Sequence, residues 1–210
     1  MVNLLIIIFL MTLFYISISG RLFICINLLV LQGLILFGIA LLSLGEEINI
    51  INLLVVLAET LLFKALILPW YIKKMVVKNK IKRHFSPFIS GFRSLLVVSG
   101  LILLSFIMGV YMQNSQLKII VLTAAFSGIL SGLFLIVSRK EIIQHIIGYI
   151  VLENGIVLLS FSMGKETPMA VNAGILLDIL ISILLFGLFM NKLAGTNKDL
   201  EIDKLNKLSD

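Results

Sequence analysis

Blocks of apolar residues, each about 20 long, recur along the whole sequence and constrain the fold more than any other feature. They occupy residues 2–19, 22–44, 52–72, 93–112, 118–138, 142–161 and 168–191. At 1.5 Å per residue, a helix of this length crosses a hydrocarbon core of about 30 Å. The blocks lack the strict alternation of apolar and polar residues that marks the strands of a membrane barrel. The sequence therefore predicts an all-α, polytopic membrane helical bundle with about seven transmembrane helices.

The composition supports lipid as the solvent of this chain. Hydrophobic residues make up 60% of the 210 and charged residues 13%, whereas soluble domains have roughly half and a quarter. The net charge of +6 does not indicate nucleic-acid binding, because the basic residues lie between the apolar blocks. No group of Cys and His residues has metal-ligand spacing, and Cys25, the single cysteine, has no disulfide partner. We therefore expect no metal site here and any redox centre in another subunit.

The distribution of Lys and Arg predicts the topology. If residues 73–92 are cytoplasmic, and Lys64 inside its block is set aside, only Lys118 and Lys165 among the basic residues face the other side. We therefore predict a multi-pass protein of the cell membrane, with its N-terminus outside and its C-terminus in the cytoplasm. Trp70 and Tyr71 fit an aromatic belt at the inner end of the third block, and Pro69 is expected to distort that end. The first block has no basic n-region, so it is expected to be a retained span.

These features divide the chain into five parts. We predict an N-terminal three-helix unit (1–72), a basic cytoplasmic loop (73–92), a linking helix (93–112), a second three-helix unit (113–191) and a cytoplasmic tail (192–210). The loop is suited to anionic headgroups or to a cytoplasmic partner. LLVLQGLILFGIALLSLGEE, from Leu28, overlays YIVLENGIVLLSFSMGKE, from Tyr149, and brings Gln32 onto Glu153. This similarity favours a parallel repeat of a three-helix unit.

Four ionisable residues lie well inside the blocks: Glu59, Lys64, Glu153 and Asp178. A charge at the centre of a membrane helix costs roughly 2.5–3.5 kcal/mol. Glu59 and Lys64 are five residues apart, which is about 140° around an α-helix. Each is therefore expected to need a partner on another helix or subunit. Two interpretations stay open, a proton relay and buried polar groups that hold the bundle together.

Uncharged polar residues accompany these charges. Asn154 follows Glu153, and His145 lies two turns earlier on roughly the same side, which predicts a polar stripe along this block. Interhelical packing is the favoured interpretation for the amides inside the blocks, namely Gln32, Asn27 and Asn172. His145 taken alone is more often structural than catalytic. Gly128 and Gly132 have GxxxG spacing, which predicts close helix packing.

The C-terminal half resembles a known subunit. The run from Arg139 through HIIGYIVLENGIVLLSF to GILLDILISILLFGLF is similar to the three-helix K subunit of bacterial respiratory complex I. In that subunit a basic pair precedes a helix with a buried Glu and an amide, and the next helix carries a second buried carboxylate. The matching positions here are Arg139, Lys140, Glu153, Asn154 and Asp178. This chain departs from the pattern by its Asp at the last position and by four additional helices.

The N-terminal half extends the resemblance. AETLLFKALILPWYI, around Glu59, Lys64 and Pro69, is similar to component E of the hydrogenase-4 and formate hydrogenlyase family, which matches the whole chain in length and layout. This resemblance implies a non-catalytic subunit in the membrane arm of a group 4 nickel-iron hydrogenase complex. It places the nickel-iron centre and iron-sulfur clusters in partner subunits, with no cofactor in this chain. Antiporter-like membrane subunits, a quinone-site-like membrane subunit and a soluble hydrogenase arm are the implied partners.

The resemblance also implies a function, the translocation of protons or sodium coupled to electron transfer from formate, ferredoxin or another donor. The expected proton relay comprises Glu153, Asp178, Glu59 and Lys64, with secondary relay or packing roles for His145, Asn154 and Gln32. Two alternatives stay open, a subunit of a multisubunit cation/proton antiporter and a stand-alone transporter. No HExxH or GxSxG pattern is present, so no catalytic residues are predicted.

Overall fold

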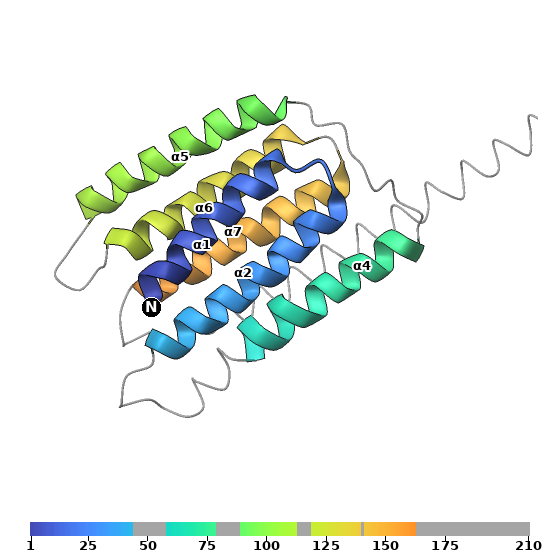
Figure 1. Cartoon of the computed structure of the whole chain (residues 1–210), viewed down its shortest axis with the longest axis horizontal. Helices are drawn as coiled ribbons and strands as arrows, with labels where there is room; N and C mark the ends of the chain where they lie inside the picture. Colours follow the sequence, from blue (N-terminus) through green and yellow to red (C-terminus); the bar gives the residue numbers. More distant parts are fainter. Residues whose placement is uncertain (44–57, 79–88, 113–118, 140, 163–210) are drawn as a thin grey trace, which may run out of the picture. The chain divides into compact units, whose positions relative to one another are not determined.

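The computed structural model describes residues 1–43, 58–78, 89–112, 119–139 and 141–162, and every regular element in these ranges is a helix (Figure 1). The elements are α1 (Val2–Ile18), α2 (Leu22–Ser43), the π-helix η1 (Ala58–Ile67), α4 (Leu68–Lys78), α5 (Gly91–Met112), α6 (Ile119–Ser138) and α7 (Ile142–Ser162). All of them belong to a compact unit of Met1–Glu166, and Thr167–Asp210 form a second unit. The predicted seventh span (168–191) and tail (192–210) lie outside the described residues.

Four of these helices are long and apolar enough to cross a membrane: Leu22–Leu42, Gly91–Met112, Ile119–Ser138 and Ile143–Ser162. The apolar helix α1 is shorter, with 17 residues. The structure therefore confirms a helical membrane protein, whereas the described residues support four spans rather than seven. The parallel repeat and the orientation of the termini stay predictions.

The third predicted block differs most from expectation. Its described part begins as a π-helix, changes to an α-helix at Leu68 and continues to Lys78. Residues 73–78, expected in a loop, are therefore helical. Pro69 lies next to this change of helix type. A proline cannot donate an i→i−4 hydrogen bond, and in an α-helix its ring would clash with the carbonyl of residue 65. The distortion predicted at this proline is thus present on its N-terminal side.

Helices α6 and α7 pack along each other more extensively than any other described pair. A Cβ atom added at Gly132 would lie 2.5 Å from the backbone nitrogen of Leu152, and one at Gly155 would lie 2.5 Å from that of Ile129. A Cβ at Gly128 would be 2.9 Å from the Cα of Gly155. Only hydrogen fits at these positions, so the glycines let the two backbones touch. The close packing predicted from Gly128 and Gly132 is confirmed.

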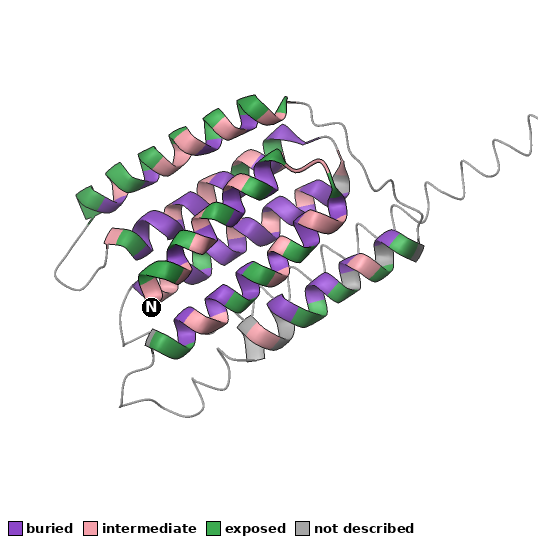
Figure 2. Cartoon of the chain, in the orientation of Figure 1, coloured by how far each residue is buried: buried purple, intermediate pink, exposed green. Residues whose placement is uncertain are grey.

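The remaining helices extend the bundle from this pair through α1 and α2. Helix α2 contacts α1, α7, η1 and α4, and α5 packs on α1 and α6. Buried residues lie on the facing sides of the helices, whereas α5 is largely exposed (Figure 2). Its exposed side chains are apolar, for example Leu103, Phe106 and Ile107, as expected of a surface that faces lipid rather than water. Helix α2 therefore occupies the middle of the described bundle.

The close approach of α6 and α7 predicts a difference between two identical substitutions. Gly155→Ala places a methyl group against the backbone of α6, so we expect it to lower the free energy of unfolding by about 1–3 kcal/mol. Gly100→Ala is the control, because a Cβ atom there meets nothing within 4 Å, and it should be neutral or slightly stabilising. Unfolding in detergent, followed by circular dichroism, measures both. Equal stability of the two variants would contradict the packing argument.

Candidate functional site

A glycine brings η1 against α2 at the position of the site. A Cβ atom at Gly33 would lie 2.9 Å from the backbone nitrogen of Ala65, so a side chain here would force the two helices apart. The sequence neighbours of these residues are Gln32 and Lys64, and both side chains are buried. The contact between α2 and η1 therefore carries Lys64 into the interior of the bundle.

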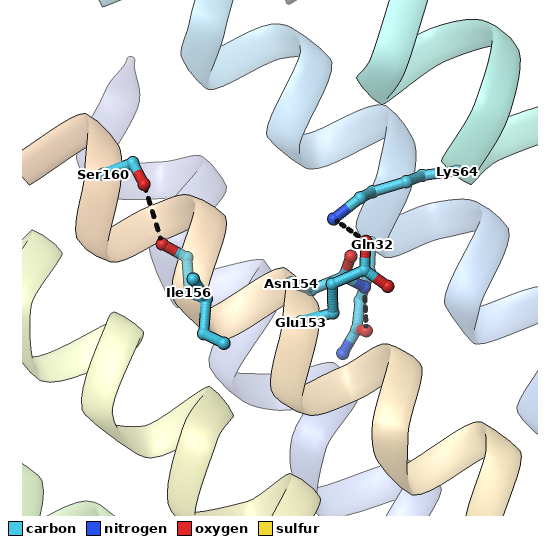
Figure 3. A network of polar contacts seen from close by, with 6 residues as sticks. All are labelled: Gln32, Lys64, Glu153, Asn154, Ile156 and Ser160. Atoms are coloured by element: carbon cyan, nitrogen blue, oxygen red, sulfur yellow. Dashed lines mark hydrogen bonds and ion pairs between the residues drawn. The ribbon is translucent and has the colours of Figure 1, made fainter. Parts of the chain in front are cut away.

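Lys64 forms an ion pair with Glu153 of α7 (Figure 3). The distance from the Lys64 Nζ to the Glu153 Oε1 is 2.9 Å, and the two side chains are 1% and 2% exposed. Lys64 thus has the partner on another helix that its insertion cost predicted. Two charges without access to water must stabilise each other, and removing one partner of such a pair typically costs about 3–5 kcal/mol. The pair therefore joins η1 to α7.

The π-helical backbone changes the relation between positions 59 and 64. The π-helix repeats its hydrogen bonds at i→i+5, so these two positions of η1 (Ala58–Ile67) lie closer together around the helix axis than they would in an α-helix. The angle of about 140° assumed α-helical geometry, and that prediction is wrong for this backbone. The side chain of Glu59 lies outside the described residues.

A chain of amide and hydroxyl groups runs beside the ion pair. Asn154 Nδ2 donates to Gln32 Oε1 at 3.0 Å, and Gln32 Nε2 donates to Thr12 Oγ1 at 2.8 Å (Figure 3 shows the first of these bonds). The Thr12 hydroxyl donates in turn to the backbone carbonyl of Phe9 at 2.6 Å. All three side chains are buried. Helices α7, α2 and α1 are therefore held together by directional bonds in their interior.

The direction of these hydrogen bonds decides whether the row of amide and hydroxyl groups can conduct a proton. Every donor points from α7 towards α1, and the last acceptor is a backbone carbonyl, which cannot pass a proton onward. The amide chain is thus a scaffold, as expected for Gln32, and Asn154 has the same role. The titratable groups at this site are the neighbouring carboxylate of Glu153 and the ammonium of Lys64. The Asn154 Oδ1 atom is buried and accepts no hydrogen bond within the described part of the chain.

The polar groups lie near the middle of their helices. Thr12 is ten residues from the start of α1 (Val2–Ile18), Gln32 ten residues from the start of α2 (Leu22–Ser43), and Glu153 eleven residues from the start of α7 (Ile142–Ser162). At 1.5 Å per residue, each is roughly 15 Å from that helix end, about half the thickness of a hydrocarbon core. The site is therefore placed where a charge costs most.

A second buried cation lies in the turn between α6 and α7. The Arg139 guanidinium donates from Nη2 to the carbonyl oxygen of Ser17 at 2.6 Å, near the end of α1. The His145 Nε2 lies 2.8 Å from the carbonyl oxygen of Arg139, and because a carbonyl only accepts, this nitrogen carries the proton. Burial lowers the pKa of Arg139 from its ordinary value. Both contacts are structural, which favours the packing interpretation of His145.

The remaining candidates fall into two groups. Asn27 is on an exposed side of α2, unlike Gln32. The candidates Lys140, Asn172 and Asp178 lie outside the described residues. Sequence reasoning missed Thr12, although a hydroxyl in the middle of an apolar block was a signal for it. Whether the ion pair acts in a relay stays a prediction.

Comparison with known proteins places the chain in a family. It is 30% identical over 188 residues to "Uncharacterized protein Rv0085" of Mycobacterium tuberculosis, a match that covers 88% of this chain and 85% of that protein. The chain belongs to the family of this mycobacterial protein. No protein-family model matches the sequence, and no solved structure matches it.

A second similarity covers part of the chain. Hydrogenase-4 component E of Escherichia coli K12 is 31% identical over 87 residues, which is 41% of this chain and 40% of that protein. The same values hold for hydrogenase-4 component E of Shigella flexneri. The resemblance to component E is therefore supported over less than half of the chain.

The ion pair predicts a strong coupling between two positions. Lys64→Met and Glu153→Gln each leave a buried group without its 2.9 Å partner, and each is expected to lower the free energy of unfolding by about 3–5 kcal/mol. The double variant should lose much less than the sum. A double-mutant cycle, measured by unfolding in detergent, gives the coupling energy. Strict additivity would show that the two side chains do not interact.

The amide chain predicts a second pair of matched variants. Gln32→Leu removes both the acceptor for Asn154 and the donor to Thr12, so a cost of about 1–3 kcal/mol is expected from the buried groups left behind. Asn27→Leu is the control in the same helix, since Asn27 is exposed, and it should change stability by less than about 0.5 kcal/mol. Thermal unfolding of both variants in the same detergent tests this, and a larger loss in Asn27→Leu would refute the assignment.

Proposed function

We propose that this chain is a membrane subunit of a hydrogenase-4-like complex and contributes buried titratable residues to proton or sodium translocation. The observation that carries the proposal is the buried Lys64–Glu153 pair, held at 2.9 Å in the middle of the bundle. Ionisable residues inside membrane bundles mark ion pathways more often than they mark simple packing. The partial similarity to hydrogenase-4 component E supplies the setting.

The pair is suited to act as a switch. A proton that moves from the Lys64 ammonium to the Glu153 carboxylate converts an ion pair into a neutral pair without any change in net charge. In a poorly solvated interior the two forms differ much less in free energy than they do in water, because desolvation disfavours both charges. A charge that moves in a neighbouring subunit can therefore change which form is favoured. This coupling is the proposed link between ion movement and an electron-transfer reaction elsewhere.

The hydrogen-bonded amides next to the ion pair hold the surrounding helices together. Gln32 and Asn154 hold α7, which carries Glu153, against α2, and η1, which carries Lys64, packs on the same helix. In the proposed relay, Glu59 and Asp178 exchange protons with this pair towards neighbouring subunits, and His145 has a secondary role. Protons and sodium are both candidate ions.

The proposal also concerns the rest of the complex. Electron transfer from formate, ferredoxin or another donor takes place in partner subunits, which hold the nickel-iron centre and the iron-sulfur clusters. This chain has no catalytic role and binds no cofactor itself. Its partners in the cell membrane are antiporter-like subunits, a quinone-site-like subunit and the soluble hydrogenase arm.

Uncoupling is the expected result of removing one charge from the pair. In membrane vesicles from the native host, Glu153→Gln and Lys64→Gln should lower proton uptake driven by hydrogenase turnover at least tenfold, while the rate of that turnover persists. Glu141→Gln is the matched control, because this partly exposed acid lies at the start of α7, away from the pair. A pH-sensitive dye measures uptake, and gas chromatography measures hydrogen.

Other outcomes separate the alternatives. If Glu153→Gln removes the chain from the complex and no assembled, uncoupled form exists, the buried charges only hold the bundle together. Co-purification in mild detergent with a nickel-iron subunit supports the proposal, whereas co-purification with subunits of a cation/proton antiporter overturns it. Ion transport by the chain alone in proteoliposomes would indicate a stand-alone transporter.

A further inference from the structure

The outer side of α4 carries an exposed aromatic ring with a cation above it. The Lys74 Nζ lies 4.8 Å from the centroid of the Trp70 ring, within the range of a cation–π interaction. Trp70 is 60% exposed, and Lys74 is exposed as well. Within the described residues Lys74 has no carboxylate partner, so its remaining N–H donors are directed at what surrounds the protein.

The opposite side of the same helix fixes this pair in place. Leu68, Ile72 and Val76 are spaced four residues apart and are buried, and α4 packs on α2 and η1. Trp70 and Lys74 are also four residues apart, on the side that is left uncovered. Helix α4 therefore cannot turn the ring and the ammonium into the bundle.

The position along the membrane normal fits a headgroup. Lys74 is ten residues beyond Lys64, which is roughly 15 Å at 1.5 Å per residue. Lys64 lies near mid-bundle, so Lys74 lies about half a hydrocarbon thickness away from it. An indole at this boundary, with a lysine reaching outward from it, has the placement at which Trp and Lys anchor membrane helices.

The charge around the pair is of one sign. No Asp or Glu occurs between Glu59 and Glu141, whereas Lys73 and Lys78 share α4 with Lys74. The chain itself therefore supplies no counterion from this long stretch of sequence. A negatively charged group from outside is needed to neutralise the surface.

We propose that Trp70 and Lys74 form a binding site for the phosphate of an anionic phospholipid. The ammonium donates to the phosphate oxygens, the indole packs beside the glycerol backbone, and the acyl chains lie along the apolar side chains of α4 and η1. Leu66 and Ile67 are both exposed there, one turn before Trp70. This site does not depend on the proposed function, because it needs neither Glu153 nor a partner subunit.

The test uses Trp70 as its own reporter, since it is the single tryptophan of the chain. The full chain is reconstituted into mixed vesicles in which either phosphatidylglycerol or phosphatidylcholine carries the bromine quencher, at equal mole fractions. We expect brominated phosphatidylglycerol to show a roughly fivefold higher relative binding constant, the factor for about 1 kcal/mol per Lys at an anionic surface. Lys74→Gln should bring this ratio close to one, and Lys74→Arg should retain it.

Arg93→Gln is the control for charge alone. Arg93 is exposed near the start of α5, a helix that packs on α1 and α6 rather than against α4, so this variant should keep the fivefold ratio. Equal quenching by both lipids in the wild type would overturn the proposal. So would equal losses in Lys74→Gln and Arg93→Gln, which would indicate a diffuse surface charge. Quenching by neither lipid would show that lipid does not reach the ring, and would overturn it too.

Discussion

The ion pair between Lys64 and Glu153 is the interaction on which the described bundle depends. An ammonium and a carboxylate, both almost fully buried and 2.9 Å apart, are each too costly to leave in hydrocarbon alone. Helix η1 can therefore be stable in the membrane only when its Lys64 reaches Glu153 of α7. The ion pair can form only when the helices assemble, and the assembled helices are stable only with the ion pair.

The packing of small residues makes that interaction geometrically possible. Gly33 lets η1 approach α2, and the glycines of α6 and α7 let those helices touch. Van der Waals contact of this kind replaces the hydrophobic effect, which does not drive helices together in lipid. The amide chain from Asn154 through Gln32 to Thr12 then fixes the rotation of α7 relative to α2. The titratable pair is thus set in a rigid frame rather than on mobile loops.

Much of this arrangement could be predicted from residue patterns. Apolar blocks identified the helices, GxxxG spacing identified the closest contact, and the cost of buried charge identified Lys64 and Glu153 as residues in need of partners. The π-helical geometry of η1 could not be predicted, because it depends on how a proline-containing helix is packed. The role of Thr12 was missed because a lone hydroxyl in an apolar helix often bonds only to its own backbone.

By itself, the sequence determined that the chain is helical, lies in a membrane and carries charges that must find partners inside it, because hydropathy and insertion cost are properties of each segment alone. Only the tertiary structure decided which partners meet. It joined Lys64 to Glu153 and Gln32 to Asn154, and it left Asn27 exposed. The physical reason is that helix rotation and close approach are set by side chains of several helices at once, and no single segment contains that information.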